Sequence, residues 1–244
     1  NLGMDEYCGL NPWTPKQTEK AVKNLEILNQ WCDKNNIIFI LVVCPSKHSV
    51  YSEKLPLMYK KNQHSRYDQL MTAVPSLINL KSVLTAEKGK VQFPLYFKTD
   101  THWNFLGGFL ATAEISKELK NHFPEAPVLR LADIEISQKT TYKGKDLANM
   151  MVLKDAVSDI EINLKYKKEH TKKINKVFIG RDSFYDYMIE PMSQLFVSVE
   201  EKPVLLSGLK ANDILKNKPD VFVLEMVERY VDELCADLDE AFYK

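Results

Sequence analysis

Two residues with the types and spacing of a catalytic pair, Asp100 and His102, lie in the segment Lys98-Thr-Asp-Thr-His-Trp-Asn104. Side chains at positions i and i+2 of an extended segment point to the same side, so the carboxylate can lie beside the imidazole. An aspartate in this place orients the ring and stabilises its protonated form, as in a hydrolase triad. The same pair could also serve simple loop bonding or a metal site, but no further ligand set at metal-binding spacing accompanies it.

Ser183 supplies a nucleophile for this pair. The segment Val177-Phe-Ile-Gly-Arg-Asp-Ser-Phe184 predicts a buried strand, a tight turn and a serine that opens a helix. Amides at the start of a helix can stabilise an oxyanion next to the serine hydroxyl. The alternative is that Asp182 or Ser183 only caps the helix. Taken together with the Asp-x-His pair, the catalytic interpretation is favoured.

Two rival nucleophiles and one further histidine follow the first apolar strand. Cys44 ends that strand and precedes a proline, which favours a buried structural thiol. Ser46 has no glycine turn before it and no evident helix after it. His48 lies where the carboxyl edge of an α/β sheet binds ligands, so a functional role and a loop-capping role are equally open.

The elements that must position these residues alternate between helices and strands. Helical spacing is found over 16–34, 104–121, 185–194 and 211–216, and an acidic helix is expected at the carboxyl terminus. Apolar runs predict strands over 37–43, 176–180, 195–199 and 221–225. This order predicts an α/β fold with a mainly parallel, doubly wound sheet. Alternating polar and apolar residues over 134–142 and 156–166 predict a small β-hairpin, so we expect one domain over 1–244 with an insertion at 133–172.

Composition limits the function classes. The 244 residues are 45% apolar and 27% charged, with 33 basic and 33 acidic side chains. This excludes a disordered or fibrous chain, and the zero net charge argues against a nucleic-acid-binding domain. The apolar runs are too short to span a bilayer, which predicts a soluble globular chain. The four cysteines leave a Cys8–Cys235 bridge and separate thiols both open.

Three segments taken in this order resemble the SGNH hydrolase-like domain of the alginate O-acetyltransferases, the AlgX/AlgJ-like family. They are Val43-Cys-Pro-Ser-Lys-His-Ser-Val-Tyr-Ser-Glu-Lys-Leu-Pro56, Thr99-Asp-Thr-His-Trp-Asn104 with Gly107-Gly108, and Gly180-Arg-Asp-Ser-Phe184. The late segment Pro219-Asp-Val-Phe-Val-Leu-Glu-Met-Val-Glu-Arg229 is similar to the closing strand of that family. Ordinary SGNH esterases place the serine first, whereas here it follows the Asp-His pair. The resemblance implies a three-layer αβα, flavodoxin-like fold.

The resemblance also implies roles for individual residues. Ser183 would be the nucleophile, His102 the general base and Asp100 its orienting acid, with an acetyl-serine intermediate. Contacts to donor or glycan would come from Lys47, Tyr96 and Arg229, each of which could equally serve packing or a salt bridge. Trp103 would either stack on a sugar or face the core. Arg181 departs from the compact Gly-Asp-Ser turn that is usual in the family.

The function implied is O-acetylation of a secreted bacterial polysaccharide, with no metal and no cofactor. The partners implied are a polysaccharide acceptor and an acetyl donor, with a membrane-bound acyl-transfer protein as one candidate source. The location implied is extracytoplasmic, in the periplasm or at the cell surface, with a signal or membrane anchor preceding the sequence. Two alternatives use the same fold: a carbohydrate acetylesterase with the same triad, and a non-catalytic scaffold or glycan-binding protein of a polysaccharide export assembly.

Overall fold

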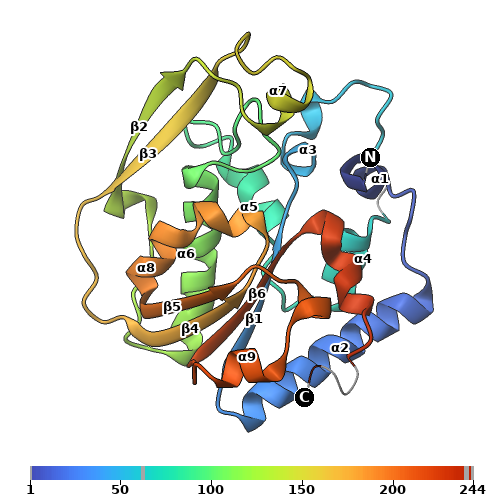
Figure 1. Ribbon diagram of the computed structural model, residues 1–244, viewed down its shortest axis with the longest axis vertical. Helices are drawn as coiled ribbons and strands as arrows, with labels where there is room; N and C mark the ends of the chain where they lie inside the picture. Colours follow the sequence, from blue (N-terminus) through green and yellow to red (C-terminus); the bar gives the residue numbers. More distant parts are fainter. Residues whose placement is uncertain (1, 62–63, 239–241, 243–244) are drawn as a thin grey trace. The chain divides into compact units, whose positions relative to one another are not determined.

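The computed structural model, drawn in Figure 1, describes residues 2–61, 64–238 and 242. The chain forms two compact units. Unit 1 contains 1–80, 174–183 and 196–244. Unit 2 contains 81–173 and 184–195. The chain therefore passes from unit 1 to unit 2 between Ser183 and Phe184, within the segment that carries the candidate nucleophile.

Unit 1 is built on a four-stranded sheet in the order β1-β6-β4-β5, in which all neighbours are parallel. The strands are β1 (Ile38–Cys44), β4 (Ile174–Gly180), β5 (Phe196–Lys202) and β6 (Val221–Val227). Every residue of β6 is buried, as expected for a central strand covered on both faces. Because the strands are parallel, the residues that follow Cys44, Gly180 and Val227 leave the sheet at one edge.

Helices cover the sheet within unit 1. They are α1 (Leu2–Cys8), α2 (Pro15–Lys34), α3 (Lys47–Val50), α4 (Arg66–Ala73) and α9 (Ala211–Leu215), with 3₁₀ turns η1 (Ser52–Lys54), η4 (Leu206–Gly208) and η5 (Glu228–Cys235). Helix α2 begins with a capping box, in which Thr14 and Gln17 satisfy each other's backbone amides. Its apolar stripe, with Leu25 and Leu28, lies in the same core as Leu41 of β1 and Phe222 of β6.

Unit 2 combines helices with one antiparallel strand pair. Its elements are α5 (Leu80–Glu87), which starts at the last residue of unit 1, α6 (Phe105–His122), η2 (Leu131–Asp133), β2 (Ile134–Thr141), α7 (Asp146–Met150), β3 (Asp159–Tyr166) and α8 (Ile189–Leu195). The register of β2 and β3 runs from Ile134 opposite Tyr166 to Thr141 opposite Asp159. Most of the first four turns of α6 is buried, and this helix packs on both β3 and α8.

The predicted fold class is confirmed, with a parallel sheet and a separate β-hairpin pair. Two helix predictions differ in detail. The stretch 185–194 is divided between the 3₁₀ turn η3 (Ser183–Tyr187) and α8, and the acidic end folds as the 3₁₀ turn η5 as far as Cys235. Of the residues after it, 239–241 and 243–244 lie outside the described part. The treatment of 1–244 as one domain stays a prediction.

All four cysteines lie among the described residues, and each is a free thiol. In the described part of the chain, no helix combines the length and the hydropathy needed to cross a bilayer.

Candidate active site

The Asp100–His102 pair forms in the loop that precedes α6. Asp100 Oδ1 lies 2.7 Å from His102 Nδ1 and also accepts the backbone N–H of His102 at 3.2 Å. Burial raises the pKa of Asp100, but hydrogen bonds from His102 and Thr101, together with the charge of His102, outweigh burial and lower it below its usual value. An ionised Asp100 holds the proton on Nδ1 and leaves Nε2 available as a base.

A residue that the sequence did not single out, Asp159, positions this loop within unit 2. Its carboxylate accepts the backbone N–H groups of Lys98 at 2.9 Å and Thr99 at 2.7 Å, as well as the Thr99 hydroxyl and the Ile160 amide. Asp159 is 1% exposed, and although burial raises its pKa, these hydrogen bonds together lower it. Asp159 therefore fixes the backbone just before Asp100.

The start of α6 explains the Asn and Gly-Gly of the predicted motif. Asn104 caps the helix, because its side-chain oxygen accepts the amides of Leu106 and Gly107 at 3.0 and 3.2 Å. A Cβ atom on Gly107 would lie 2.5 Å from the Leu95 carbonyl oxygen, and one on Gly108 would lie 2.1 Å from the Tyr187 carbonyl oxygen. Both glycines are required for backbone to approach backbone at this point.

Aromatic rings surround His102 inside unit 2. The centroid of its ring lies 4.9 Å from that of Phe184 and 5.9 Å from that of Tyr187. Burial, followed by the charge of Asp100, raises the pKa of Tyr187 to about 12, which keeps its hydroxyl neutral. The residue that directly follows Ser183 in the chain is thus part of the wall around the imidazole.

Trp103 and Tyr96 belong to the same unit and are joined by an isolated β-bridge. Trp103 is fully buried, and its indole N–H donates to the Phe184 carbonyl at 2.8 Å. Of the two roles that the sequence left open for Trp103, stacking on a sugar and facing the core, its position fits the second. Tyr96 is 3% exposed.

In unit 1, Ser183 follows a turn that is bonded to both neighbouring strands. Asp182 donates its amide to Glu225 of β6 at 2.9 Å, and its carboxylate accepts the amide of Val227 at 2.7 Å. On the other side, the Arg181 amide donates to the Lys202 carbonyl of β5 at 3.1 Å. The additional arginine in the Gly-Arg-Asp-Ser sequence is thereby accommodated, and Ser183 itself is exposed.

Glu225 is the second residue that the sequence did not single out. It is completely buried and accepts the Cys44 thiol at 2.9 Å in addition to the Asp182 amide. Burial, and then the Asp182 carboxylate, raises the pKa of Glu225 well above its usual value. Burial and Glu225 likewise raise the pKa of Cys44, which has no exposed surface. Cys44 is thus the buried thiol that its sequence context favoured.

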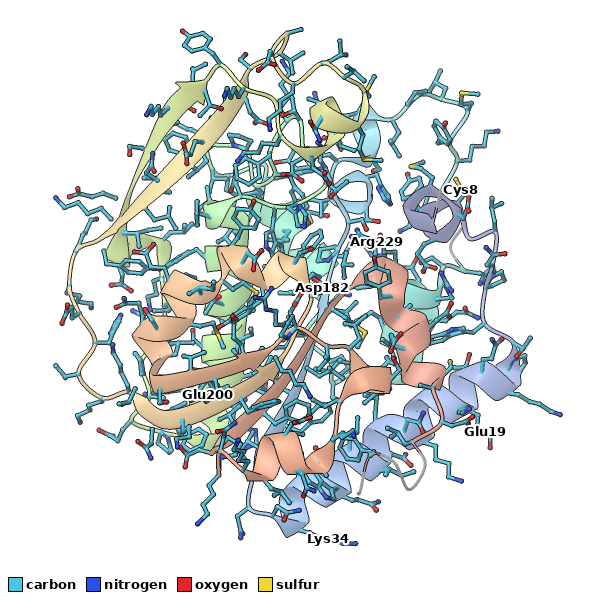
Figure 2. All side chains as sticks on the ribbon, in the orientation of Figure 1. Cys8, Glu19, Lys34, Asp182, Glu200 and Arg229 are labelled. Carbon is cyan, nitrogen blue, oxygen red and sulfur yellow. The ribbon has the colours of Figure 1, made fainter. Side chains whose placement is uncertain are left out.

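The segment after β1 places Lys47 and His48 near Arg229 in unit 1. Figure 2 shows Asp182 and Arg229 just beyond the carboxyl ends of β4 and β6. Burial, together with the charges of Arg229 and Lys47, lowers the pKa of His48 to about 4 despite a hydrogen bond to the backbone of Gly3. His48 is therefore neutral near pH 7, with its Nε2 3.8 Å from Glu228.

Ser46 differs from its predicted context. A short helix, α3, does follow it, and the serine occupies the N-cap position with 2% of its surface exposed. Its burial makes it a poor candidate for the nucleophile. Among the residues that the structure describes, no three His, Cys, Asp or Glu side chains are grouped so that they could hold a metal ion.

A parallel α/β sheet, an Asp-x-His pair before a helix and a serine after a strand define an SGNH hydrolase-like domain. The chain belongs to the family of SGNH hydrolase-like acetyltransferase domains represented by AlgX, whose family model matches residues 11–207. Comparison with curated proteins gives no match.

Solved structures share the fold at low sequence identity. The O-acetyltransferase domain of Pseudomonas putida AlgJ has a TM-score of 0.62 and 17% identity, with 93% of this chain and 88% of that chain covered. Bacillus cereus PatB1 with a sulfonyl adduct has a TM-score of 0.65 and 15% identity, with 91% of each chain covered. Pseudomonas aeruginosa AlgX has a TM-score of 0.50 and 14% identity, with 88% of this chain and 61% of that chain covered.

Proposed function

We propose that the protein is an O-acetyltransferase that acts on a secreted polysaccharide through Ser183, His102 and Asp100. The observation that carries the proposal is the 2.7 Å bond between Asp100 and His102, made next to the ring of Phe184. Ser183 is joined to Phe184 by a peptide bond, and consecutive Cα atoms are about 3.8 Å apart. The serine is therefore tethered to a residue that contacts the imidazole.

In the proposed first step, the Ser183 oxygen attacks the carbonyl carbon of an acetyl donor while His102 Nε2 takes the hydroxyl proton. The carbonyl becomes an oxyanion, for which the Ser183 amide is one donor. When the intermediate collapses, the bond to the donor breaks, and the leaving group takes the proton from His102. The product of this half-reaction is acetyl-Ser183.

In the second step, a sugar hydroxyl attacks the acetyl carbon and passes its proton to His102. Collapse of this intermediate transfers the acetyl group to the sugar and returns the proton to Ser183. Asp100 stabilises the imidazolium in both steps. Lys47 and Arg229, both positive and close to the sheet edge, are proposed to contact donor or glycan, and Tyr96 and Trp103 to shape the region around His102.

Family membership supports the acetyltransferase chemistry, and the AlgJ neighbour is itself described as an O-acetyltransferase domain. We further propose that the acceptor is a polysaccharide and that the protein acts in an extracytoplasmic location. We also propose that the acetyl group reaches this chain from a separate donor, for which a membrane-bound acyl-transfer protein is one candidate.

The test is release of p-nitrophenol from p-nitrophenyl acetate, with and without oligosaccharide acceptors. We expect Ser183→Ala and His102→Ala each to lower turnover by about 10³-fold or more, and Asp100→Asn by about 10²- to 10⁴-fold. Ser193→Ala is the matched control, because Ser193 lies on α8 and donates only to the Glu190 carbonyl. It should retain wild-type turnover.

The products distinguish transfer from hydrolysis. Acetylated oligosaccharide, detected by mass spectrometry, is expected for a transferase, whereas free acetate alone would indicate an esterase with the same triad. Equal turnover by the wild type and Ser183→Ala would refute the proposed nucleophile and favour a non-catalytic scaffold.

A further inference from the structure

Residues 142–154 (the 142–154 loop), which form most of the segment that joins β2 to β3, present apolar side chains to solvent. Figure 1 shows this loop in yellow, with α7 inside it. Soluble proteins rarely expose several large apolar side chains side by side without a binding role. The exposed fractions are 83% for Tyr142, 74% for Met150, 67% for Met151, 91% for Val152 and 40% for Leu153.

The loop backbone holds these side chains outward. Val152 has a φ of 58°, a left-handed conformation that is costly for a β-branched residue. Its amide donates to Asn149 at 3.0 Å, and the next amide, of Leu153, donates to Ala148 at 2.8 Å. Across the base of the loop, Gly144 donates to Lys154 at 2.6 Å. A network that fixes an unfavourable conformation points to a function for the exposed tip.

Basic side chains lie in the same loop as the apolar residues. A cavity of about 810 Å³ is lined by Thr141, Tyr142, Lys143, Gly144, Lys145, Asp146, Asn149 and Lys154. Three of these residues are lysines and one is an aspartate, so the lining carries a net positive charge. Long lysine stems can lie along an apolar surface while the ammonium group reaches a more polar layer.

We propose that the 142–154 loop docks on the surface of an anionic lipid bilayer. Tyr142 and the Met150–Leu153 tip enter the boundary between headgroups and acyl chains, where aromatic and apolar side chains of peripheral proteins lie. Lys143 and Lys154 pair with lipid phosphates. Charge complementarity selects this occupant: an exposed apolar tip in a loop that also carries lysines matches a layer that is apolar beneath and anionic at its surface.

Docking would also place the catalytic pair relative to the bilayer, because the loop is bonded to the segment before Asp100. Leu147 donates its amide to the Thr99 carbonyl at 3.0 Å, and the Lys145 amide donates to the Thr99 hydroxyl at 2.9 Å. The Lys145 ammonium lies 4.1 Å from the centre of the Phe97 ring. These contacts all lie within unit 2.

Vesicle flotation tests the proposal with the full chain. We expect binding to vesicles of phosphatidylcholine containing about one third phosphatidylglycerol, and at least ten-fold weaker binding to phosphatidylcholine alone. The triple variant Met150→Ser, Met151→Ser, Val152→Ser should lose at least ten-fold of this binding. The matched control is Val197→Ser on β5, an apolar residue that is 69% exposed in unit 1, and it should bind as the wild type does.

The electrostatic part is tested with the double variant Lys143→Gln, Lys154→Gln. Each lysine near an anionic surface strengthens binding about five-fold, so we expect a loss of about 25-fold at low salt. Addition of glycerophosphate distinguishes a free phosphate site from a membrane: competition at millimolar concentration would overturn the bilayer as the occupant. Equal flotation of the wild type and the triple variant, or no flotation with either vesicle, would also overturn the proposal. So would association of the chain with itself through this loop, seen as a larger species that the triple variant abolishes.

Discussion

Replacement of Glu225 by glutamine tests how the turn before Ser183 is held. Glu225 is buried between the Asp182 amide and the Cys44 thiol, both 2.9 Å from its oxygens. Because its pKa is raised in the folded protein, the folded state holds a proton that the unfolded chain releases above its own pKa of about 4.3. The wild type must therefore lose stability as the pH rises from the unfolded pKa towards the folded pKa.

The size of this effect follows from linkage. One proton gives a slope of about 1.4 kcal/mol per pH unit between the two pKa values. Glutamine does not titrate, and its oxygen can still accept the Asp182 amide. We therefore expect the free energy of unfolding of Glu225→Gln, relative to the wild type, to increase with pH by up to about 2.7 kcal/mol from pH 5 to pH 7.

Urea unfolding of both proteins at pH 5, 6, 7 and 8 measures this difference, and pH effects shared by the two proteins cancel. Glu201→Gln is the control, because Glu201 lies on β5, is exposed and pairs with Arg181. The difference in free energy of unfolding between Glu201→Gln and the wild type should change by no more than about 1 kcal/mol over the same pH range. Parallel pH profiles for the wild type and Glu225→Gln would contradict this expectation, because they would mean that Glu225 is equally ionised in the folded and unfolded states.

Three further perturbations follow from the same contacts. Asp159→Ala should lower the free energy of unfolding at pH 7 by about 2 kcal/mol or more, because several buried donors lose their acceptor. The stabilisation that Asp159 gives the wild type should disappear in acid, as the pH falls through the lowered pKa of Asp159. An unchanged urea midpoint at pH 7 would contradict this. Gly108→Ala should lower the free energy of unfolding by about 3 kcal/mol or more, since its Cβ would overlap the Tyr187 carbonyl. Gly89→Ala is the control and should be nearly neutral, because the nearest atom to its Cβ is 3.9 Å away. Equal melting temperatures for the two variants would argue against the close approach at Gly108. In the native protein at pH 8, Cys44 should react with a thiol reagent far more slowly than the partly exposed Cys8, and similar rates found by peptide mapping would show that Cys44 is accessible.

The sequence predicted the strands and long helices because each has a strong local pattern. β1 and β6 are continuous apolar runs, the β2–β3 pair alternates, and α2 and α6 have both periodicity and a capping residue. Short elements carry too few residues for such a pattern. The four-residue helix α3 after Ser46 was missed for this reason. The acidic end near Glu228 forms a 3₁₀ turn whose apolar residues Val231 and Leu234 pack into the core of unit 1.

The candidate site was predictable only where its residues are close in sequence. Asp100 and His102 are two positions apart, so their bond could be inferred from extended geometry. Asp159 and Glu225 could not be found in this way, because the backbone groups that they bind lie about 60 and 43 positions away in the sequence. A charged residue within the otherwise apolar β6 is the one signal that could have indicated Glu225, since buried carboxyl groups need hydrogen-bond partners.

Trapping of the acyl-enzyme tests directly whether Ser183 is the nucleophile. The wild type would be mixed with p-nitrophenyl acetate, quenched in acid and digested, and the peptide that contains Ser183 would be examined by mass spectrometry. We expect the mass of one acetyl group on Ser183, and none on that peptide in Ser183→Ala or His102→Ala. An acetyl group found instead on another residue, such as Ser46, or unchanged labelling in His102→Ala, would contradict it.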